Sequence, residues 1–375
     1  MSSRADRYPR KGCNSDVMVD LKIAFKRFSQ LEAKGQSNLY EYLTLEISKD
    51  PELLQIASVI PPEQPAPNLF LAAVHWLLMK NSNEPLTNYY PHLSHIPSPD
   101  KGSYDVFRRF VLRNRDKIQA ILREKKVQTC VVERCGILLP AFATIAARNP
   151  GKSLALVEFG AAAGLNLFWD KYKYTYLNSD ITIGPSESKV SIETKLRGMY
   201  RPAMFSNMPT ISHRVGIDLS PIDVFNADHC SWLKALLWPQ EKNNTRLYNL
   251  TNAIDQAKLH RPKVYKGDAI NLLPDILYNI PLTDTLIVYN THTLNQFAET
   301  EQVRLNQIMD NVGKRRNFYW VSSEYRSSVN IFDKSKGLDT LRPTLLLSTF
   351  TNGERFDETL AKCHHHGAWL EWFSK

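Results

Sequence analysis

The fold follows from the run Leu154-Ala-Leu-Val-Glu158-Phe-Gly160-Ala-Ala162-Ala-Gly164-Leu-Asn166-Leu. An apolar segment, typical of a buried strand, ends in the acid Glu158 and passes into a turn of small residues that opens a helix. Glycine at positions 160 and 164 lets a ligand approach the backbone, and free N–H groups at a helix start favour a polar or anionic group. The run is typical of a nucleotide-binding loop, although small residues at such a turn also serve close packing alone.

The spacing of the small residues separates two kinds of nucleotide site. A dinucleotide fingerprint has the pattern G-x-G-x-x-G, whereas this chain has G-x-A-x-G with Glu158 before it. The looser pattern acid-x-G-x-G-x-G resembles that of S-adenosylmethionine-dependent methyltransferases, and Ala162 is a mild departure from it. The loop therefore favours S-adenosylmethionine as the cofactor.

Three later segments also end in polar residues. They are His213–Asp218, Lys263–Asp268 and Thr285–His292. In a doubly wound sheet, a carboxylate such as Asp218 lies at the rim of the cleft and can accept the two ribose hydroxyls of an adenosine. One polar strand end needs no function, but four in chain order, separated by helical patterns, predict a largely parallel α/β sheet.

The predicted cofactor-binding residues come from these strand ends and their loops. They are Glu158, Gly160, Ala162, Gly164, Asn166, Asp218, Asp268, Ala269 and Asn290. In this hypothesis the cofactor lies across the tips of the first two strands, with Glu158 at its methionine end, Asp218 on the ribose and Asp268 near the adenine.

Two residues are candidates for the chemistry. His292 directly follows the fourth strand and can take a proton near neutral pH. Glu324 follows Phe318-Tyr-Trp-Val-Ser-Ser, which is expected as a fifth strand, and can bind an acceptor amine there. If these strands are neighbours, the two side chains should face one another across the cleft. A hydrogen-bonded structural histidine and a plain surface carboxylate are the alternatives. The run Cys363-His-His-His366 is not interpreted as a metal site, because adjacent residues point in different directions.

Nearly the whole chain resembles domain-of-unknown-function family 2332. The resemblance is carried by Pro67-Asn-Leu-Phe-Leu-Ala-Ala-Val-His75, Arg134-Cys-Gly-Ile-Leu-Leu-Pro140, Glu158 to Leu167, Arg214-Val-Gly-Ile-Asp218-Leu-Ser-Pro221, Trp232-Leu-Lys-Ala-Leu-Leu-Trp238-Pro239 and His366-Gly-Ala-Trp369-Leu-Glu-Trp372. It implies a methyltransferase-like Rossmann fold behind a helical N-terminal part, and no particular reaction. One departure is Cys130-Val131, where the resemblance implies an Asn-Glu pair after Val127-Gln-Thr129.

Composition indicates a stable globular protein. The chain has 375 residues, of which 43% are hydrophobic, enough for two moderate cores. No apolar run is long enough to span a bilayer and the start lacks the apolar core of a secretory signal, so we expect a cytoplasmic protein. The five cysteines form no C-x-x-C pair and are too scattered for a disulfide framework.

The net charge of +9 raises the question of a polyanionic partner. Basic residues gather between Arg108 and Lys126, on a helical stretch whose apolar positions account for a buried face. A solvated helix surface is the simpler interpretation, and a nucleic-acid footprint is the alternative. Neither the methyl acceptor nor the oligomeric state follows from these residues.

The organisation along the chain predicts two domains. Residues 1–150 have helical patterns and form a cap or lid, and residues 151–375 form a Rossmann-like, methyltransferase-type doubly wound sheet. A β-hairpin subdomain is inserted at about 172–212, over the cleft. Thr344–Phe350 and Ala368–Phe373 are expected as closing strands, joined by a helical run through Leu360, with the last strand antiparallel. The leading hypothesis is a methyltransferase; the rival is a non-catalytic scaffold that retains the fold.

Overall fold

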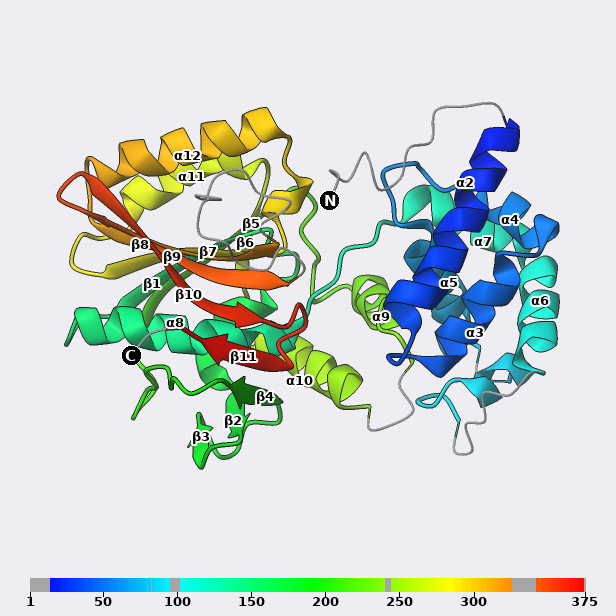
Figure 1. Ribbon diagram of the computed structural model, residues 1–375, viewed down its shortest axis with the longest axis horizontal. Helices are drawn as coiled ribbons and strands as arrows, with labels where there is room; N and C mark the ends of the chain where they lie inside the picture. Colours follow the sequence, from blue (N-terminus) through cyan, green and yellow to red (C-terminus); the bar gives the residue numbers. More distant parts are fainter. Residues whose placement is uncertain (1–13, 82, 95–101, 240–243, 326–341, 374–375) are drawn as a thin grey trace. The chain divides into compact units, whose positions relative to one another are not determined.

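The computed structural model describes residues 14–81, 83–94, 102–239, 244–325 and 342–373. The chain divides into two compact units (Figure 1). We call residues 130–225 and those from 249 onward the sheet unit. The helical unit holds residues 4–129 together with 226–248. Residues 130–150 are therefore grouped with the sheet, and a later segment returns to the helices.

The helical unit contains no strand in its described residues. Its elements are α2 (Asn14–Arg27), η1 (Phe28–Ala33), α3 (Asn38–Ile47), α4 (Pro51–Ala57), α5 (Ala66–Met79), η2 (Pro85–Tyr89), α6 (Ser103–Arg113), α7 (Arg115–Glu124) and α9 (Ala227–Ala235). The side chain of Asp50 accepts the amides of Glu52 and Leu53, and Pro51 occupies the first turn of α4, where it loses no hydrogen bond. The apolar faces of these helices enclose one core.

The sheet unit is an α/β structure built on one mixed sheet of eleven strands. Five parallel strands form its centre in the order β6-β5-β1-β7-β8: Lys263–Lys266, Ile211–Asp218, Leu154–Phe159, Thr285–Thr291 and Phe318–Tyr325. The chain leaves β1 for β5 on one side and later crosses to β7 on the other. The sheet therefore has a topological switch point at β1, where ligands bind in open α/β sheets.

Helices cover both faces of this centre (Figure 1). The helices α11 (Ala269–Asn279) and α12 (Glu299–Gly313) lie on one face, with a core that includes Val157, Leu273 and Met309. The other face packs on α8 (Cys135–Arg148), which is buried almost all round. A further helix, α10, spans Thr245–His260. No described helix is long and apolar enough to cross a membrane.

The end of the chain differs from the expectation. The strands β9 (Pro343–Thr351) and β11 (Trp369–Trp372) form, but the helical run through Leu360 is wrong: those residues lie in the strand β10 (Glu354–Cys363). The reason is a hairpin turn at Asn352-Gly353, where both residues have positive φ (+53° and +82°). Asn-Gly is the preferred pair for a two-residue hairpin, and it commits the flanking segments to antiparallel pairing.

The insertion joins the main sheet. Its strands are β2 (Lys173–Leu177), β3 (Ile181–Ile183) and β4 (Ser191–Arg197), and β2 and β3 pair as the expected antiparallel hairpin. Because β4 pairs with both β2 and β11, the insertion extends the sheet at the end remote from β6. A Cβ at Gly136 in α8 would lie 2.1 Å from Oγ1 of Thr194 in β4, so glycine permits this close approach. The insertion thus covers α8.

Candidate functional site at the carboxyl edge of the sheet

The parallel register brings the predicted strand-end residues to one edge of the sheet. Glu158 of β1 lies opposite Tyr289 of β7, and Asn290 of β7 lies opposite Ser322 of β8. Because all five central strands are parallel, their carboxyl ends share this edge. We call it the carboxyl edge.

The loop after β1 adopts a left-handed backbone at three positions. The φ angles are +71° at Gly160, +51° at Ala162 and +67° at Gly164. A Cβ at Gly160 would lie 2.3 Å from Oγ1 of Thr293, and one at Gly164 would lie 2.9 Å from the side chain of Val264. The two glycines are therefore required by the protein's own packing as well as by φ.

The amides of this loop are mostly used inside the protein. The amides of Gly160 and Ala161 donate to the carbonyl of Ile217 at 2.8 and 3.1 Å. The amide of Ala162 donates to the Asp218 carboxylate at 2.8 Å, and that of Gly164 to the carbonyl of Ala161 at 2.7 Å. A phosphate-binding loop directs its amides at the ligand. Four amides of this loop are therefore directed at the protein rather than at a ligand.

The turn opens a shorter helix than the sequence predicts. The element η4 (Leu165–Lys171) is a seven-residue 3₁₀-helix with a non-helical break at Phe168, after which the chain enters β2. Its start supplies no long α-helix dipole. Any ligand at this loop must therefore be recognised mainly by side chains.

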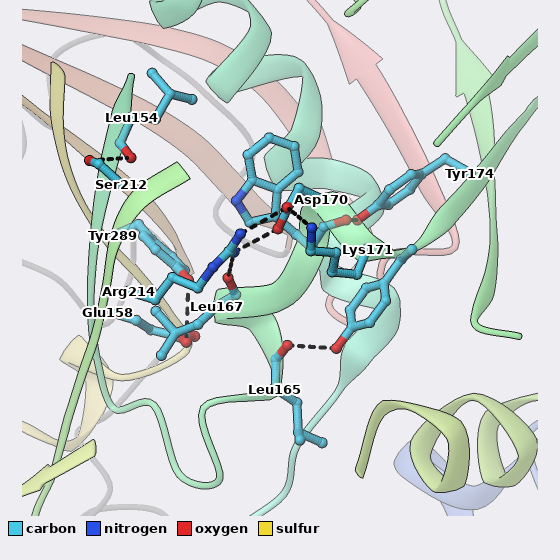
Figure 2. A network of polar contacts seen from close by, with 12 residues as sticks. Leu154, Glu158, Leu165, Leu167, Asp170, Lys171, Tyr174, Ser212, Arg214 and Tyr289 are labelled. Carbon is cyan, nitrogen blue, oxygen red and sulfur yellow. Dashed lines mark hydrogen bonds and ion pairs between the residues drawn. The ribbon is translucent and has the colours of Figure 1, made fainter. Parts of the chain in front are cut away.

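Glu158 is a buried carboxyl group beside this loop. Its side chain is 2% exposed and accepts a hydrogen bond from Asn166 at 3.3 Å. It also accepts one from the Tyr289 hydroxyl at 3.4 Å (Figure 2). Burial raises the pKa of Glu158 to about 8, more than the two hydrogen bonds lower it. The group is mostly protonated at neutral pH, and a cation placed beside it would deprotonate it.

An ion pair that the sequence did not reveal fixes the elements around Glu158. The guanidinium of Arg214 in β5 donates to both carboxylate oxygens of Asp170 at 2.6 and 2.8 Å, and also to the carbonyl of Leu167 (Figure 2). This bidentate bond ties η4 to the sheet. A charged residue in the middle of an apolar strand was the only available signal.

Asp218 and Asp268 both hold backbone amides. The two oxygens of Asp218 accept the amides of Ala162 and Ser220, each at 2.8 Å. Asp268 is the N-cap of α11 and accepts the amide of Ile270 at 2.9 Å, so Ala269 is the buried first residue of that helix. Backbone amides therefore fix both carboxylates at the ends of β5 and β6.

Glu324 is buried at the end of β8, with its two oxygens in different surroundings. Oε1 accepts the amides of Thr293 and Leu294 at 2.6 and 2.9 Å and the amide group of Asn290 at 2.9 Å. Oε2 is enclosed without a hydrogen-bond partner. Burial raises the pKa of Glu324 to about 7. Asn290 also accepts from the Trp320 indole, so it is fixed in place.

His292 follows β7 with a left-handed backbone, φ +53°. Its Nε2 is enclosed without a hydrogen-bond partner, and its ring centroid lies 5.5 Å from that of Tyr325. Burial, followed by the charges of Arg134, His365 and His364, holds the pKa of His292 well below its ordinary value. The imidazole is therefore neutral at physiological pH.

The strands that carry His292 and Glu324 are neighbours, as expected. No hydrogen bond or ion pair joins the two side chains, which are both described. His292 lies among cationic groups, whereas Glu324 binds loop amides. Their catalytic roles stay predictions. Nε2 of His292 and Oε2 of Glu324, the two side-chain atoms without a partner, are therefore treated separately.

Two further residues reach this edge from the start of the sheet unit. Arg134 donates from Nε to the carbonyl of His365 at 3.0 Å and from Nη1 to Oγ1 of Thr291 at 3.4 Å. Burial raises the pKa of the Cys130 thiol to about 12, although the amide of Ala163 partly offsets this. The position that departs from the family resemblance is thus a neutral thiol at the loop. These contacts join distant parts of the chain, so no local sequence pattern predicts them.

The basic stretch of the helical unit is partly neutralised. It forms two helices, α6 and α7, and its predicted apolar face is buried, including Phe107 and Ile118. Arg108 pairs with Asp50 at 2.7 Å, and Arg113 pairs with Glu84. Nucleic-acid binding remains a prediction without support from these contacts.

One family matches this chain. It is described as "Uncharacterized protein conserved in bacteria (DUF2332)", and the match covers residues 22–372. No curated protein and no solved structure matches the chain.

Proposed function

We propose that this chain, which belongs to the bacterial family DUF2332, is an S-adenosylmethionine-dependent methyltransferase. The order β6-β5-β1-β7-β8 followed by antiparallel β9 supports a Rossmann-like plan of the methyltransferase type, with the cofactor at the switch point beside β1. The family description assigns no reaction, so the proposal depends on the geometry of the carboxyl edge.

The single observation that carries the proposal is the loop after β1. It follows a buried acid, has three left-handed residues, and spends its amides on Ile217, Asp218 and Ala161. A dinucleotide needs amides for its pyrophosphate, whereas S-adenosylmethionine has no phosphate and carries a positive sulfonium. An acid-tipped loop that uses four of its amides within the fold suits the second ligand better than the first.

The chain's own residues would hold the cofactor from three strand ends. Glu158, fixed by Asn166 and Tyr289, provides a carboxyl group for the cationic methionine end. Asp218 accepts the ribose hydroxyls while it keeps the loop closed through the amide of Ala162. Asp268 and Ala269 border the adenine from the end of β6, and Asn290 borders the reacting end.

The bound sulfonium supplies an activated methyl group, so the protein needs to provide little covalent chemistry. Its residues orient the two substrates and exclude water. His292 directly follows β7, the strand that carries Asn290, and Glu324 lies in the neighbouring strand β8. We assign both residues to the acceptor side. The acceptor is then the variable part of the site.

Calorimetric titration of the full chain with S-adenosylmethionine and S-adenosylhomocysteine tests the proposal. We expect micromolar binding of both. Asp218→Ala should weaken it at least about tenfold, since a carboxylate that accepts two hydroxyls contributes roughly 1.5–3 kcal/mol. Asp223→Ala, at an exposed position of the following loop, is the matched control.

Two outcomes would count against the proposal. If neither ligand binds the folded protein, the rival interpretation of a non-catalytic scaffold is favoured. If both bind but Asp218→Ala has no effect in a folded variant, Asp218 does not touch the ribose. Gly160→Val is unsuitable as a test, because its side chain would first collide with Thr293.

A further inference from the structure

The turn between β10 and β11 brings a group of histidines to the carboxyl edge. The rings of His364 and His365 have centroids 4.2 Å apart, and those of His365 and His366 are 4.1 Å apart. All three side chains are half-buried. This packing orders three imidazoles in one short turn.

Glycine places this turn against the start of the sheet unit. Gly367 has φ +77°, and a Cβ there would lie 2.1 Å from the carbonyl oxygen of Glu133. Its own carbonyl accepts a hydrogen bond from Thr194 at 3.0 Å. The position of the turn is therefore fixed by backbone contacts that a larger residue would break.

Arg134 joins the turn to the end of β7. It donates to the carbonyl of His365 and to the hydroxyl of Thr291. The charges of Arg134, His364 and His365 all act on His292. Because Thr291 directly precedes His292, the two contacts of Arg134 bring the histidine turn and the segment of His292 together.

The enclosed Nε2 of His292 is the independent sign of a ligand. A buried polar atom without a partner costs free energy unless a ligand or water completes it. His292 also keeps a left-handed backbone that histidine adopts infrequently, and such strain is concentrated at functional sites. The guanidinium of Arg134 contacts Thr291, the residue directly before His292, so a positive charge lies close to this histidine.

We propose that Arg134, His292, His364 and His365 form a binding site for an oxyanion, a carboxylate or phosphate group carried by a small ligand. Guanidinium and imidazole N–H groups bind such anions through charge-assisted hydrogen bonds. The anion would complete Nε2 of His292 and favour protonation of the neighbouring imidazoles. If the chain is a methyltransferase, the anionic group belongs to the methyl acceptor, and this clause alone rests on the proposed function.

A metal ion is a poorer occupant. Among the described residues, no group of three His, Cys, Asp or Glu side chains has metal-binding geometry. The imidazoles of the turn pack ring against ring. A guanidinium at the centre of the group also opposes a second positive charge.

The test uses the full chain without S-adenosylmethionine and follows the histidine ring signals by NMR. Inorganic phosphate and acetate are titrated separately, with chloride at matched ionic strength as the reference. We expect one or both anions to shift the signals of His292, His364 and His365. His292→Asn, which tolerates the left-handed backbone, should weaken binding about tenfold, as loss of one hydrogen bond to a charged group implies.

The matched control is His213, which is paired with Asp284 at the other edge of the sheet. Its signal should stay unchanged, and His213→Gln should bind like the unaltered chain. A phosphate-only or acetate-only response identifies the chemical group and supports the site. No response at the three rings, or an equal response at His213, overturns the proposal. Because the cofactor is absent, failure here leaves the methyltransferase proposal standing.

Discussion

His75 in the helical unit and His292 in the sheet unit are both histidines in enclosed surroundings, yet their hydrogen bonding differs. The Nδ1 of His75 lies 2.9 Å from the carbonyl of Ala235, and its Nε2 lies 2.7 Å from Nε2 of His92. Nε2 of His292 has no partner. Burial lowers both pKa values, to about 3 for His75. Burial therefore does not distinguish the two histidines, whereas the unsatisfied ring nitrogen of His292 does.

Two buried acids, Asp170 and Glu324, also differ in whether their hydrogen bonds are complete. Asp170 is buried and makes two bonds to Arg214, so it has a structural role. Glu324 is also buried, but its Oε2 has no hydrogen bond. Two of the buried polar atoms without a partner, Oε2 of Glu324 and Nε2 of His292, lie at the carboxyl edge, which is where we place the substrates. Others lie elsewhere among the described residues, such as Nε1 of Trp76 in the helical unit.

The largest effect should come from removing the satisfied histidine. His75→Ala deletes a buried ring and leaves the carbonyl of Ala235 and the ring of His92 without their partner. We expect a loss of about 3 kcal/mol in the free energy of unfolding, from the cavity and the unpaired groups. Chemical denaturation followed by far-UV circular dichroism measures it. A loss below about 1 kcal/mol would show that the pair is not structural.

Acid should destabilise the helical unit through the same pair. The pKa values of His75 and His92 are lowered from 6.5 to about 3 and about 4. Between pH 6.5 and the lowered pKa values, these two histidines bind protons only in the unfolded chain. Their contribution to the free energy of unfolding is therefore full above pH 6.5 and falls as the pH drops. The expected slope is about 1.4 kcal/mol per pH unit for each histidine. Hydrogen exchange of α5 amides measures it, and a flat profile in this window contradicts the assignment.

The sheet unit should show the opposite sign. Burial raises the pKa of Glu158 from 4.5 to about 8 and that of Glu324 to about 7. Their contribution is full below pH 4.5 and is lost as the pH rises through the folded pKa values. Exchange of β1 amides should therefore accelerate with pH beyond the intrinsic rate. Glu158→Gln should flatten this dependence; if it does not, Glu158 is not the buried titrating group.

The smallest effect on stability should come from the orphan histidine. His292→Asn keeps a residue that tolerates positive φ and breaks no side-chain hydrogen bond, so we expect a change below about 1 kcal/mol. Turnover of a true acceptor should fall by roughly 10²–10⁴ if His292 is a general base, while cofactor affinity is unchanged. Unfolding as severe as that of His75→Ala would make His292 structural.

The sequence was sufficient for local features and insufficient for long-range contacts. Hydrophobic patterning predicts β1, β5, β7 and β8, because a buried strand appears in the sequence as a short run of consecutive apolar residues. The helix expected through Leu360 is wrong because the Asn352-Gly353 turn commits the following residues to the antiparallel strand β10. The bond from Arg134 to His365 joins residues 231 positions apart, and no local pattern encodes it.

The measurement that tests the central claim most directly is proton release on cofactor binding. Calorimetry of S-adenosylmethionine binding in two buffers of different ionisation enthalpy counts the protons released. A cation beside Glu158 should lower its pKa from about 8, so the chain should release protons near neutral pH and affinity should rise with pH up to about 8. Glu158→Gln should abolish the protein's share of this release. Equal proton release by the variant and the unaltered chain would contradict a cofactor site at Glu158.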